Sequence, residues 1–451
     1  MILFVSSCDP GLPDISNQDA ESWTPVSPSF HVKTNGSPKG DGSINSPWDL
    51  ATALTHSSIK PGDTIYIHDG TYTGFYQSRL YGTVDSPIII RPWHNDTVII
   101  DGAAFLQGVM AVLDFGGQYT HLIGIKITNS ASDHFEHVDT NDGVYFIGPG
   151  NKLLNCIISG NSGNGIGFWS TAINAEVSGC IIYNNGAIGP NRGHGHGLYV
   201  QQGTEGNKII RNNIIFSSFG KGIQVYGTGV PVHNTIIEDN IFFNAALAAG
   251  VHEQNIYIGS VNYTANNHIV RNNVFYASPG FPGTPASIKF GDAFTYNGEA
   301  SFTGNYSVDS FLHITRRWDR MTARNNTYIA RTGEERIVVG HDVYDYVTVK
   351  DYDWNIYHRG RIGENNASGF QAITLQAIQE YNGQELNSIY HDDLPKQTAV
   401  FLKPAGENRW HAAVFNWADA QSVNAAVPGL KAGDSYALFY VSALNSGAAT
   451  T

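Results

Sequence analysis

Apolar and polar residues alternate in the same way in seven short segments between residues 143 and 314. In each segment two apolar positions flank one residue that varies freely. Alternation with a period of two is typical of a β-strand, so we expect the apolar residues inside and the variable ones outside. The segments are Gly143-Val144-Tyr145-Phe146, Gly165-Ile166-Gly167-Phe168, Gly197-Leu198-Tyr199-Val200, Gly222-Ile223-Gln224-Val225, Asn255-Ile256-Tyr257-Ile258, Ser287-Ile288-Lys289-Phe290 and Phe311-Leu312-His313-Ile314.

A second repeated position predicts a stack of side chains along the molecule. It holds Cys156, Cys180, Asn213, Asn240, Asn273, Asn305 and Asn326. Identical amides at one turn of every repeat are expected to bond along the stack and to satisfy backbone groups that the bend leaves unpaired. On adjacent rungs Cys156 and Cys180 would be ~4.8 Å apart with parallel side chains, which suits stacked buried thiols better than a disulfide.

Repeats of this size with several short strands each indicate a solenoid. Before the repeats lie Gly40-Asp41-Gly42-Ser43, Ser46-Pro47-Trp48-Asp49-Leu50, Lys60-Pro61-Gly62-Asp63-Thr64-Ile65-Tyr66-Ile67 and Gly70-Thr71-Tyr72. With these segments the chain resembles the right-handed parallel β-helix proteins of the pectate-lyase-like superfamily, over roughly residues 29–340. The resemblance implies an all-β fold with a short N-terminal capping helix at about residues 48–58. It does not imply one activity, because the superfamily contains lyases, hydrolases, epimerases and phage adhesins.

The chain divides into three segments by its pattern. Residues 29–394 are expected to form the β-helix. Residues 395–451 alternate as antiparallel strands and predict a small β-sandwich-like module, truncated because the chain stops before a full set of strands. Residues 1–28 are interpreted as a lipoprotein signal remnant and tether, with Cys8 as the residue that would carry the lipid.

Composition narrows the class of protein. The 451 residues include 49 Gly, only 14% are charged, and the net charge is −13. Many glycines and few charges favour short strands joined by tight turns over helices or disorder. The negative charge disfavours nonspecific binding to nucleic acid, and no apolar run is long enough to span a bilayer. We expect a monomeric, bacterial, extracytoplasmic protein that is secreted, periplasmic or lipid-anchored.

The variable outward positions predict a carbohydrate-binding face. Aromatic rings mixed with amides suit the apolar faces and hydroxyl edges of sugars, although tyrosines are also ordinary in strands. The first outward row is Tyr145, Gly167, Tyr199, Gln224, Tyr257, Lys289 and His313. The row two residues further on is Ile147, Trp169, Gln201, Tyr226, Gly259, Gly291 and Thr315.

A third row lies in the turn just before each strand. It holds Asp142, Asn164, His196, Lys221, Gln254, Ala286 and Ser310. Simple alternation would point this row inward, but a lysine between apolar layers is implausible without a partner. The following glycine is therefore interpreted as a bend that turns the row outward, which would place His196 and Lys221 beside Tyr199 and Gln224.

The charges on this face favour a lyase. A glycoside hydrolase generally needs two carboxylates, and the three rows contain only Asp142, with Asp114 and Asp292 flanking them. Cations gather there instead, which suits a uronic-acid polysaccharide. In β-elimination a base removes the proton alpha to the carboxylate, a cation neutralises the carboxylate and an acid protonates the leaving oxygen.

Roles for β-elimination follow from the residue types. We expect Lys221 or His196 as the base and Tyr199 or Tyr257 as the acid. Lys289 and Arg316 would neutralise the carboxylate. The residues expected to bind substrate are Tyr145, Trp169, Gln201, Gln224, Tyr226, His313, Arg316 and Arg192.

Three alternatives stay open. One is a hydrolase that uses Asp142, Asp114 or Asp292, and another is a noncatalytic glycan-binding adhesin. The third concerns metals: His194 and His196 have a spacing that a transition metal accepts. Calcium is also possible for a β-helix lyase, although no acidic cluster in the sequence identifies a site. The residues that could complete a transition-metal site are His134, His137, His252 and Glu253.

Overall fold

The computed structural model describes most of the chain. The described residues are 2–7, 29–104, 106–135, 140–189, 192–227, 229–250, 253–278, 288–292, 296–331, 337–342, 347–366, 369–406, 409–431 and 437–440. Cys8 and the tether at 9–28 lie outside them, as do His137, His252 and Ala286.

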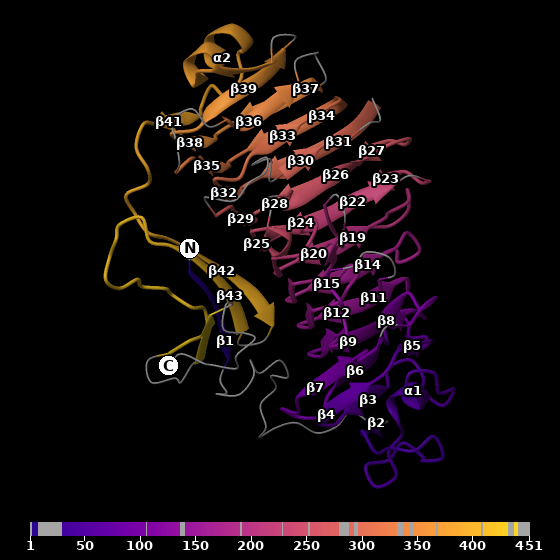
Figure 1. The fold of residues 1–451 in the computed structure, drawn as a ribbon. Helices are drawn as coiled ribbons and strands as arrows, with labels where there is room; N and C mark the ends of the chain where they lie inside the picture. Colours follow the sequence, from indigo (N-terminus) through magenta and orange to yellow (C-terminus); the bar gives the residue numbers. More distant parts are fainter. Residues whose placement is uncertain are drawn as a thin grey trace.

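The chain winds into a solenoid with three faces, each a sheet of 12 strands (Figure 1). Successive strands go to the first, second and third sheet in turn, and neighbours within a sheet pair in parallel at almost every step. The predicted all-β solenoid is therefore confirmed.

The first sheet contains β2 (Ser29–Val32), β3 (Thr64–Ile67), β6 (Ile88–Pro92), β9 (Thr120–Ile123), β12 (Lys152–Leu154), β15 (Ala175–Ser178), β20 (Lys208–Arg211), β24 (Thr235–Glu238), β28 (His268–Arg271), β31 (Tyr296–Thr303), β34 (Arg317–Arg324) and β37 (Val347–Asp353). The second contains β4 (Gly70–Thr73), β7 (Val98–Asp101), β10 (Lys126–Thr128), β13 (Ile157–Ser159), β16 (Ile181–Tyr183), β21 (Ile214–Phe216), β25 (Ile241–Phe243), β29 (Val274–Tyr276), β32 (Tyr306–Val308), β35 (Thr327–Ile329), β38 (Ile356–His358) and β41 (Ile389–His391). The third contains β5 (Tyr76–Ser78), β8 (Ala111–Phe115), β11 (Asp142–Phe146), β14 (Ile166–Phe168), β19 (Leu198–Val200), β22 (Ile223–Gly227), β26 (Ile256–Ser260), β30 (Ile288–Phe290), β33 (Leu312–Ile314), β36 (Ile337–Asp342), β39 (Arg361–Asn366) and the antiparallel β40 (Gly369–Ile373).

Short elements cover the two ends of the coil and decorate its turns. The predicted N-terminal helix is α1 (Leu50–Ala53), and Asp49 caps it by accepting the Thr52 backbone N–H at 2.8 Å. At the other end lies α2 (Leu375–Asn382). The turns carry the small pairs β17 (Ala187–Ile188) with β18 (Gly193–His194) and β23 (Val232–His233) with β27 (Ala265–Asn266), and the 3₁₀ helix η1 (Leu247–Ala249).

The constant apolar residues of the repeats fill the interior. Phe115, Phe146 and Phe168 are fully buried and stand one above another, with ring centroids 5.2 and 4.6 Å apart. Identical positions on successive rungs thus pack on each other, as the alternation predicts.

The predicted amide stack runs through the core beside the bend between the first and second sheets. Each asparagine side chain accepts the backbone N–H of the preceding rung, as Asn240 Oδ1 does from Asn213 N at 3.0 Å. Its own amide donates to a backbone carbonyl, as Asn240 Nδ2 does to Ile210 O at 2.9 Å. Cys156 and Cys180 continue the row as free buried thiols, which confirms the prediction for both cysteines.

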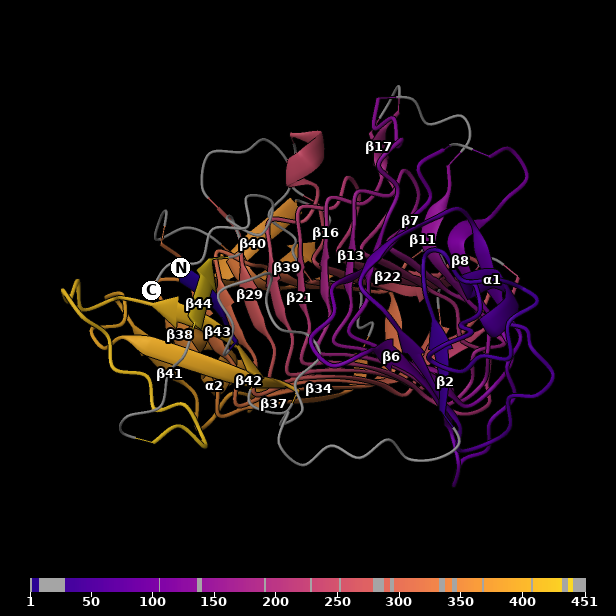
Figure 2. The same cartoon turned by 90° about the horizontal axis from the view of Figure 1, so that it is seen from below.

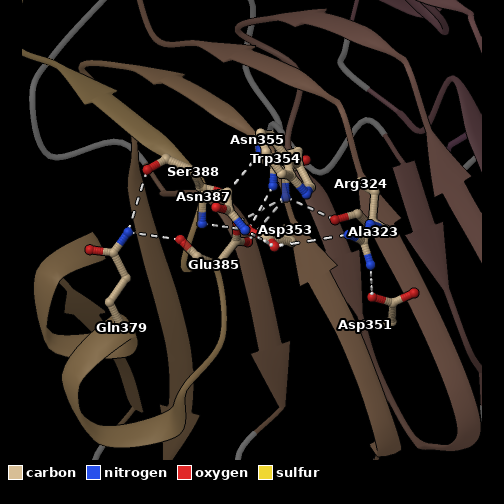
Figure 3. A network of polar contacts seen from close by, with 10 residues as sticks. All are labelled: Ala323, Arg324, Asp351, Asp353, Trp354, Asn355, Gln379, Glu385, Asn387 and Ser388. Carbon is tan, nitrogen blue, oxygen red and sulfur yellow. Dashed lines mark hydrogen bonds and ion pairs between the residues drawn. The ribbon is translucent and has the colours of Figure 1, made fainter.

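Glu385 ends the amide stack near the C-terminal end of the coil (Figure 3). Its carboxylate accepts the Asn355 amide at 2.9 Å and the Tyr357 hydroxyl at 2.7 Å. Arg324, with Asp351 and Asp353, lies beside it in the same view. The side-chain amide of Asn355, the last asparagine of the stack, is therefore satisfied by a buried carboxylate.

Removing one amide from the middle of the stack should destabilise the protein. In an Asn273→Ala variant the buried Asn240 N–H and Ile237 carbonyl lose their partner, which costs about 2–5 kcal/mol for two unsatisfied groups. We expect a lower urea midpoint and a lower melting temperature. An exposed amide outside the left-handed region, Asn207→Ala, is the matched control, and equal losses in the two variants would contradict the role of the stack.

The C-terminal residues form an antiparallel sheet beside the solenoid, as predicted. It is ordered β42 (Ala399–Gly406), β43 (Arg409–Phe415), β1 (Ile2–Ser7) and β44 (Ala437–Tyr440) (Figure 2). The N-terminal strand was not expected, because residues 1–8 read as the end of a signal. It pairs with both β43 and β44.

This small sheet packs on the outer face of the second sheet. Trp417 Nε1 donates to the Tyr306 hydroxyl at 2.7 Å, and the Tyr306 and Phe415 rings lie 5.2 Å apart. Lys403 Nζ reaches Asp239 Oδ1 at 2.9 Å. The described part of the module therefore covers the second sheet. Within the described residues, none of the helices has the length and apolar character that crossing a membrane requires.

Candidate active site

The outer face of the third sheet carries the residues predicted to act on substrate. Strand pairing places the first outward row in the expected order, one residue per rung. The row is Tyr145, Gly167, Tyr199, Gln224, Tyr257, Lys289 and His313.

A cationic cluster surrounds Tyr257 on this face. Lys221 Nζ lies 5.5 Å and Lys289 Nζ 5.0 Å from the centre of the Tyr257 ring. Lys221 Nζ is also 3.3 Å from Glu253 Oε2. Because Tyr257 is an outward residue, the Lys221 side chain also lies on the outer face, as the bend at the following glycine predicts.

Asp292 joins two tyrosines beside the lysines. The hydroxyls of Tyr226 and Tyr257 hydrogen-bond to Asp292, and their rings are 6.1 Å apart. Burial, followed by the hydrogen bond to Asp292 and its charge, raises the pKa of Tyr257 far above its usual range. Arg316 Nε donates to the Asp292 carbonyl at 2.5 Å. The phenol of Tyr257 therefore keeps its proton at neutral pH between two lysines.

His196 is nearly buried and its basic nitrogen is occupied. Nδ1 accepts the Lys221 backbone N–H at 2.9 Å, so the proton of the neutral ring is on Nε2, and the ring also bonds to the Gln224 side chain. Burial, followed by the charges of Lys221, Arg192 and His194, holds the pKa of His196 well below its usual range. These contacts suit a positioning role for His196 and not the role of base.

The third row forms its own hydrogen-bonded chain along the axis. Asp142 Oδ1 accepts Asn164 N at 2.7 Å, Asn164 Oδ1 accepts His196 N at 3.0 Å, and His196 accepts Lys221 N. Each side chain fixes the backbone of the next rung. The chain ends at Lys221, whose own side chain is the one that reaches the cluster.

Asp142 begins this chain and lies against Gly167. Only 7% of its surface is exposed, and burial raises the pKa of the Asp142 carboxyl to about 7. A Cβ on Gly167 would be 2.5 Å from Asp142 Oδ2 and 2.7 Å from Trp169 Nε1, so a side chain there would have to displace both groups. The carboxyl is thus held over the outer face without direct access to solvent.

An Asp142→Asn variant should be more stable than the wild type at high pH. The folded-state pKa is raised, so the neutral form stabilises the fold at low pH and this stability is lost as pH rises through about 7. Asparagine keeps the acceptor and carries no charge. We expect a melting temperature a few degrees higher than that of the wild type at pH 8.5 and a clearly smaller difference at pH 5, because the wild type loses this stability progressively between about pH 4 and pH 7. An equal difference in melting temperature at both pH values would contradict the raised pKa of Asp142.

The remaining predicted residues lie at other points of the face. Trp169 is between Tyr145 and Tyr199, with ring centroids 5.3 and 5.5 Å away, and Gln201 Nε2 donates to the Tyr199 hydroxyl at 3.4 Å. His313 follows Lys289 on the next rung and stacks on Phe311. Arg192 is exposed in the β17–β18 turn.

Two of the carboxylates named for a hydrolase, Asp142 and Asp292, are too far apart to act as a pair. Asp142 and Asp292 belong to rungs five steps apart, roughly 24 Å at the spacing of neighbouring strands, whereas a glycosidase pair is about 5–10 Å apart. Asp114 is held by Arg79, with Nη1 and Oδ1 3.0 Å apart. This pair of aspartates is therefore excluded as a glycosidase acid and base by its geometry.

The described part of the chain does not bring together the side chains considered for a transition-metal site. No group of three histidine, cysteine or acidic side chains there is close enough to hold an ion. His196 Nδ1 accepts the Lys221 backbone N–H, and His134 Nδ1 lies 2.5 Å from the Gly186 carbonyl. The carboxylates of the face are dispersed, and Asp114, Asp142, Glu253 and Asp292 each have a partner within the protein.

Two residues of the site were not identified correctly from the sequence. Glu253 was considered only as a metal ligand, although it is the ion partner of Lys221. Lys208 was not considered at all. It occupies an inward position of β20 and pairs with Ala175 and Thr235 on the neighbouring rungs. A charged residue at an inward position is unusual, and this pattern could have identified Lys208 from the sequence.

The fold defines the class of protein. Residues 107–307 match a family model described as right handed beta helix region. The chain is therefore a right-handed parallel β-helix protein, as the resemblance implied.

Two curated relatives and two solved structures are similar to the chain. Pectate lyase L of Thermoclostridium stercorarium is 23% identical over 363 residues, which cover 65% of this chain and 27% of the relative. Pectate lyase PEL9 of Emericella nidulans is 24% identical over 213 residues, 46% of this chain and 52% of the relative. The chain thus spans about a quarter and a half of their lengths.

The structure of pectate lyase Pel9A is 15% identical, with a TM-score of 0.44 and coverage of 77% of this chain and 82% of that one. That of lacto-N-biosidase from Eubacterium ramulus is 15% identical, with a TM-score of 0.46 and coverage of 73% and 66%. Both likenesses concern the coil, and the assignment of chemistry rests on the residues of the face.

Proposed function

We propose that the protein is a polysaccharide lyase that cleaves a uronic-acid-containing polysaccharide by β-elimination on the outer face of the third sheet. The observation that carries the proposal is the placement of two lysines, from different rungs, over the ring of one protonated tyrosine. The names of the two curated relatives support a polysaccharide lyase in general.

The residues of the cluster match the steps of β-elimination. Lys289 and Arg316 bind the uronate carboxylate and stabilise the negative charge that develops on it. Lys221, acting as the neutral amine, removes the proton on the carbon next to that carboxylate, which forms the new double bond as the bond to the leaving oxygen breaks. Tyr257 donates its proton to that oxygen, and Tyr199 is the alternative acid. No water is consumed.

His196 serves this mechanism indirectly. It holds the backbone of Lys221 through Nδ1 and stays neutral because burial and nearby cations lower its pKa. The assignment of the base is therefore narrowed to Lys221, whose side chain reaches the face.

Incubation with alginate, polygalacturonate and glycosaminoglycans tests the proposal. A lyase produces an unsaturated uronate with new ultraviolet absorbance, whereas a hydrolase produces reducing ends without it. Retention of the polysaccharide without products would indicate a glycan-binding protein, which the row Tyr145, Trp169 and Tyr199 could support on its own. Either of the last two results would overturn the proposal.

Location and assembly stay predictions. Secretion or a lipid anchor at Cys8, a bacterial source and a monomeric state agree with an enzyme that acts on an external polymer. Calcium dependence is tested by adding a chelator to an active preparation.

A further inference from the structure

Three aromatic side chains form a continuous stripe on the rungs that precede the lysine cluster, and its last member, Tyr199, adjoins the cluster. Tyr145 and Tyr199 occupy the outward row two rungs apart, and Gly167 between them has no side chain. The indole of Trp169 occupies that place beside the Asp142 carboxyl, since Trp169 Nε1 lies 2.7 Å and Asp142 Oδ2 2.5 Å from where a Cβ on Gly167 would be. Tyr145, Trp169 and Tyr199 are called the aromatic stripe below.

The aromatic stripe lacks the cations that surround Tyr257. In β8, β11, β14 and β19 the outward positions hold Asp114, Tyr145, Gly167 and Tyr199, with no lysine or arginine. Arg79 nearby is engaged by Asp114 in two hydrogen bonds. An anionic sugar bound there would lose its hydration without gaining a counter-charge, whereas the rings suit the apolar face of an uncharged sugar.

A buried lysine fixes the aromatic stripe from inside the coil. Lys208 is fully buried, and its Nζ donates to the carbonyls of Trp169 and Ala172 at 2.8 Å each. The same Nζ lies 4.3 Å from the centre of the Phe168 ring. Lys208 therefore holds the turn that begins at Trp169, at the cost of burying an amine.

We propose that the aromatic stripe is a subsite for an uncharged sugar, with Lys208 as its positioning residue. The polymer cleaved would then contain neutral sugars next to its uronates. The stripe is centred three rungs from Tyr257, roughly 14 Å away, so one chain lying along the face can occupy both places. This inference rests on the proposed lyase function, which assigns the cluster around Tyr257 to the uronate.

Steady-state kinetics with two kinds of polymer tests the subsite. Alginate and polygalacturonate carry a carboxylate on every unit, while hyaluronan and rhamnogalacturonan alternate uronates with uncharged sugars. We expect the wild type to have a lower KM for at least one alternating polymer than for both uronate-only polymers. A Trp169→Ala variant should raise that KM about tenfold and leave kcat within about twofold. Equal KM values for the wild type and Trp169→Ala, or preference for uronate-only polymers, would overturn the proposal.

Lys208→Met tests the positioning role. It should raise KM in the same direction as Trp169→Ala, and in the Trp169→Ala background it should add little, because both changes act on one element. Additive effects would show that Lys208 acts elsewhere. Lys152→Met, a partly exposed lysine on the first sheet, is the matched control.

Affinity electrophoresis separates failure of the subsite from failure of the lyase assignment. If no polymer gives an unsaturated product but the alternating polymers retard the wild type and not Trp169→Ala, the subsite stands and the lyase assignment falls. If products form and Trp169→Ala binds and cleaves like the wild type, the subsite falls alone.

Discussion

Replacing Lys221 by methionine should lower the initial rate of unsaturated-uronate formation by about 10²–10⁴-fold, the usual contribution of a general base. Lys221 Nζ lies over Tyr257 and beside Glu253, and it belongs to the turn that leads into β22. Methionine keeps the length of the side chain and removes the amine. The rate is measured by ultraviolet absorbance on the polymer that the wild type cleaves fastest, with KM determined separately.

The control for this variant is an exposed lysine at the end of the coil, Lys60→Met, which should leave the rate unchanged. A Glu253→Gln variant adds a second reading. Glutamine removes the ion partner of Lys221 Nζ, which lies 3.3 Å away, so the amine should be held less firmly and the rate should fall several-fold. A rate for Lys221→Met within tenfold of the wild type would refute Lys221 as the base.

The fold was predictable because its determinants repeat along the chain. The strand cores, the amide stack and the two thiols each depend on the same local position in successive rungs, and parallel pairing preserves that position. The register of the strands places residues that are far apart in the sequence, from Tyr145 to His313, next to one another along one face. The third row was harder, since alternation alone points it inward and only the bend before each strand reverses that.

Other features depend on contacts that no repeat encodes. The pairing of β1 with β43 joins the two ends of the chain, and nothing in residues 2–7 specifies a partner so far away. The role of Lys208 depends on the two backbone carbonyls that accept hydrogen bonds from its amine, and these carbonyls belong to another turn of the chain. A positioning role for His196 was also hidden in the sequence, because the residue type suggests a base while the hydrogen bond at Nδ1 is visible only in space.

Two substitutions at His196 should differ strongly in activity. His196→Asn should retain most of the lyase rate, within several-fold of the wild type, whereas His196→Leu should lose about 10²-fold. The amide oxygen of asparagine can accept the Lys221 N–H as Nδ1 does, and Asn164 already does the same on the preceding rung by accepting His196 N at 3.0 Å. Leucine fills the space but leaves that N–H without an acceptor, so the turn carrying Lys221 can shift.

The comparison separates a positioning residue from a base because asparagine cannot take a proton in this pH range. If His196 were the base, both variants would lose activity equally. If it fixes Lys221, asparagine restores the rate, and the pH–rate profile of His196→Asn keeps the acid limb of the wild type, since neutral His196 does not titrate there. Thermal melting of both variants provides the control, because a loss of fold would lower the melting temperature together with the rate.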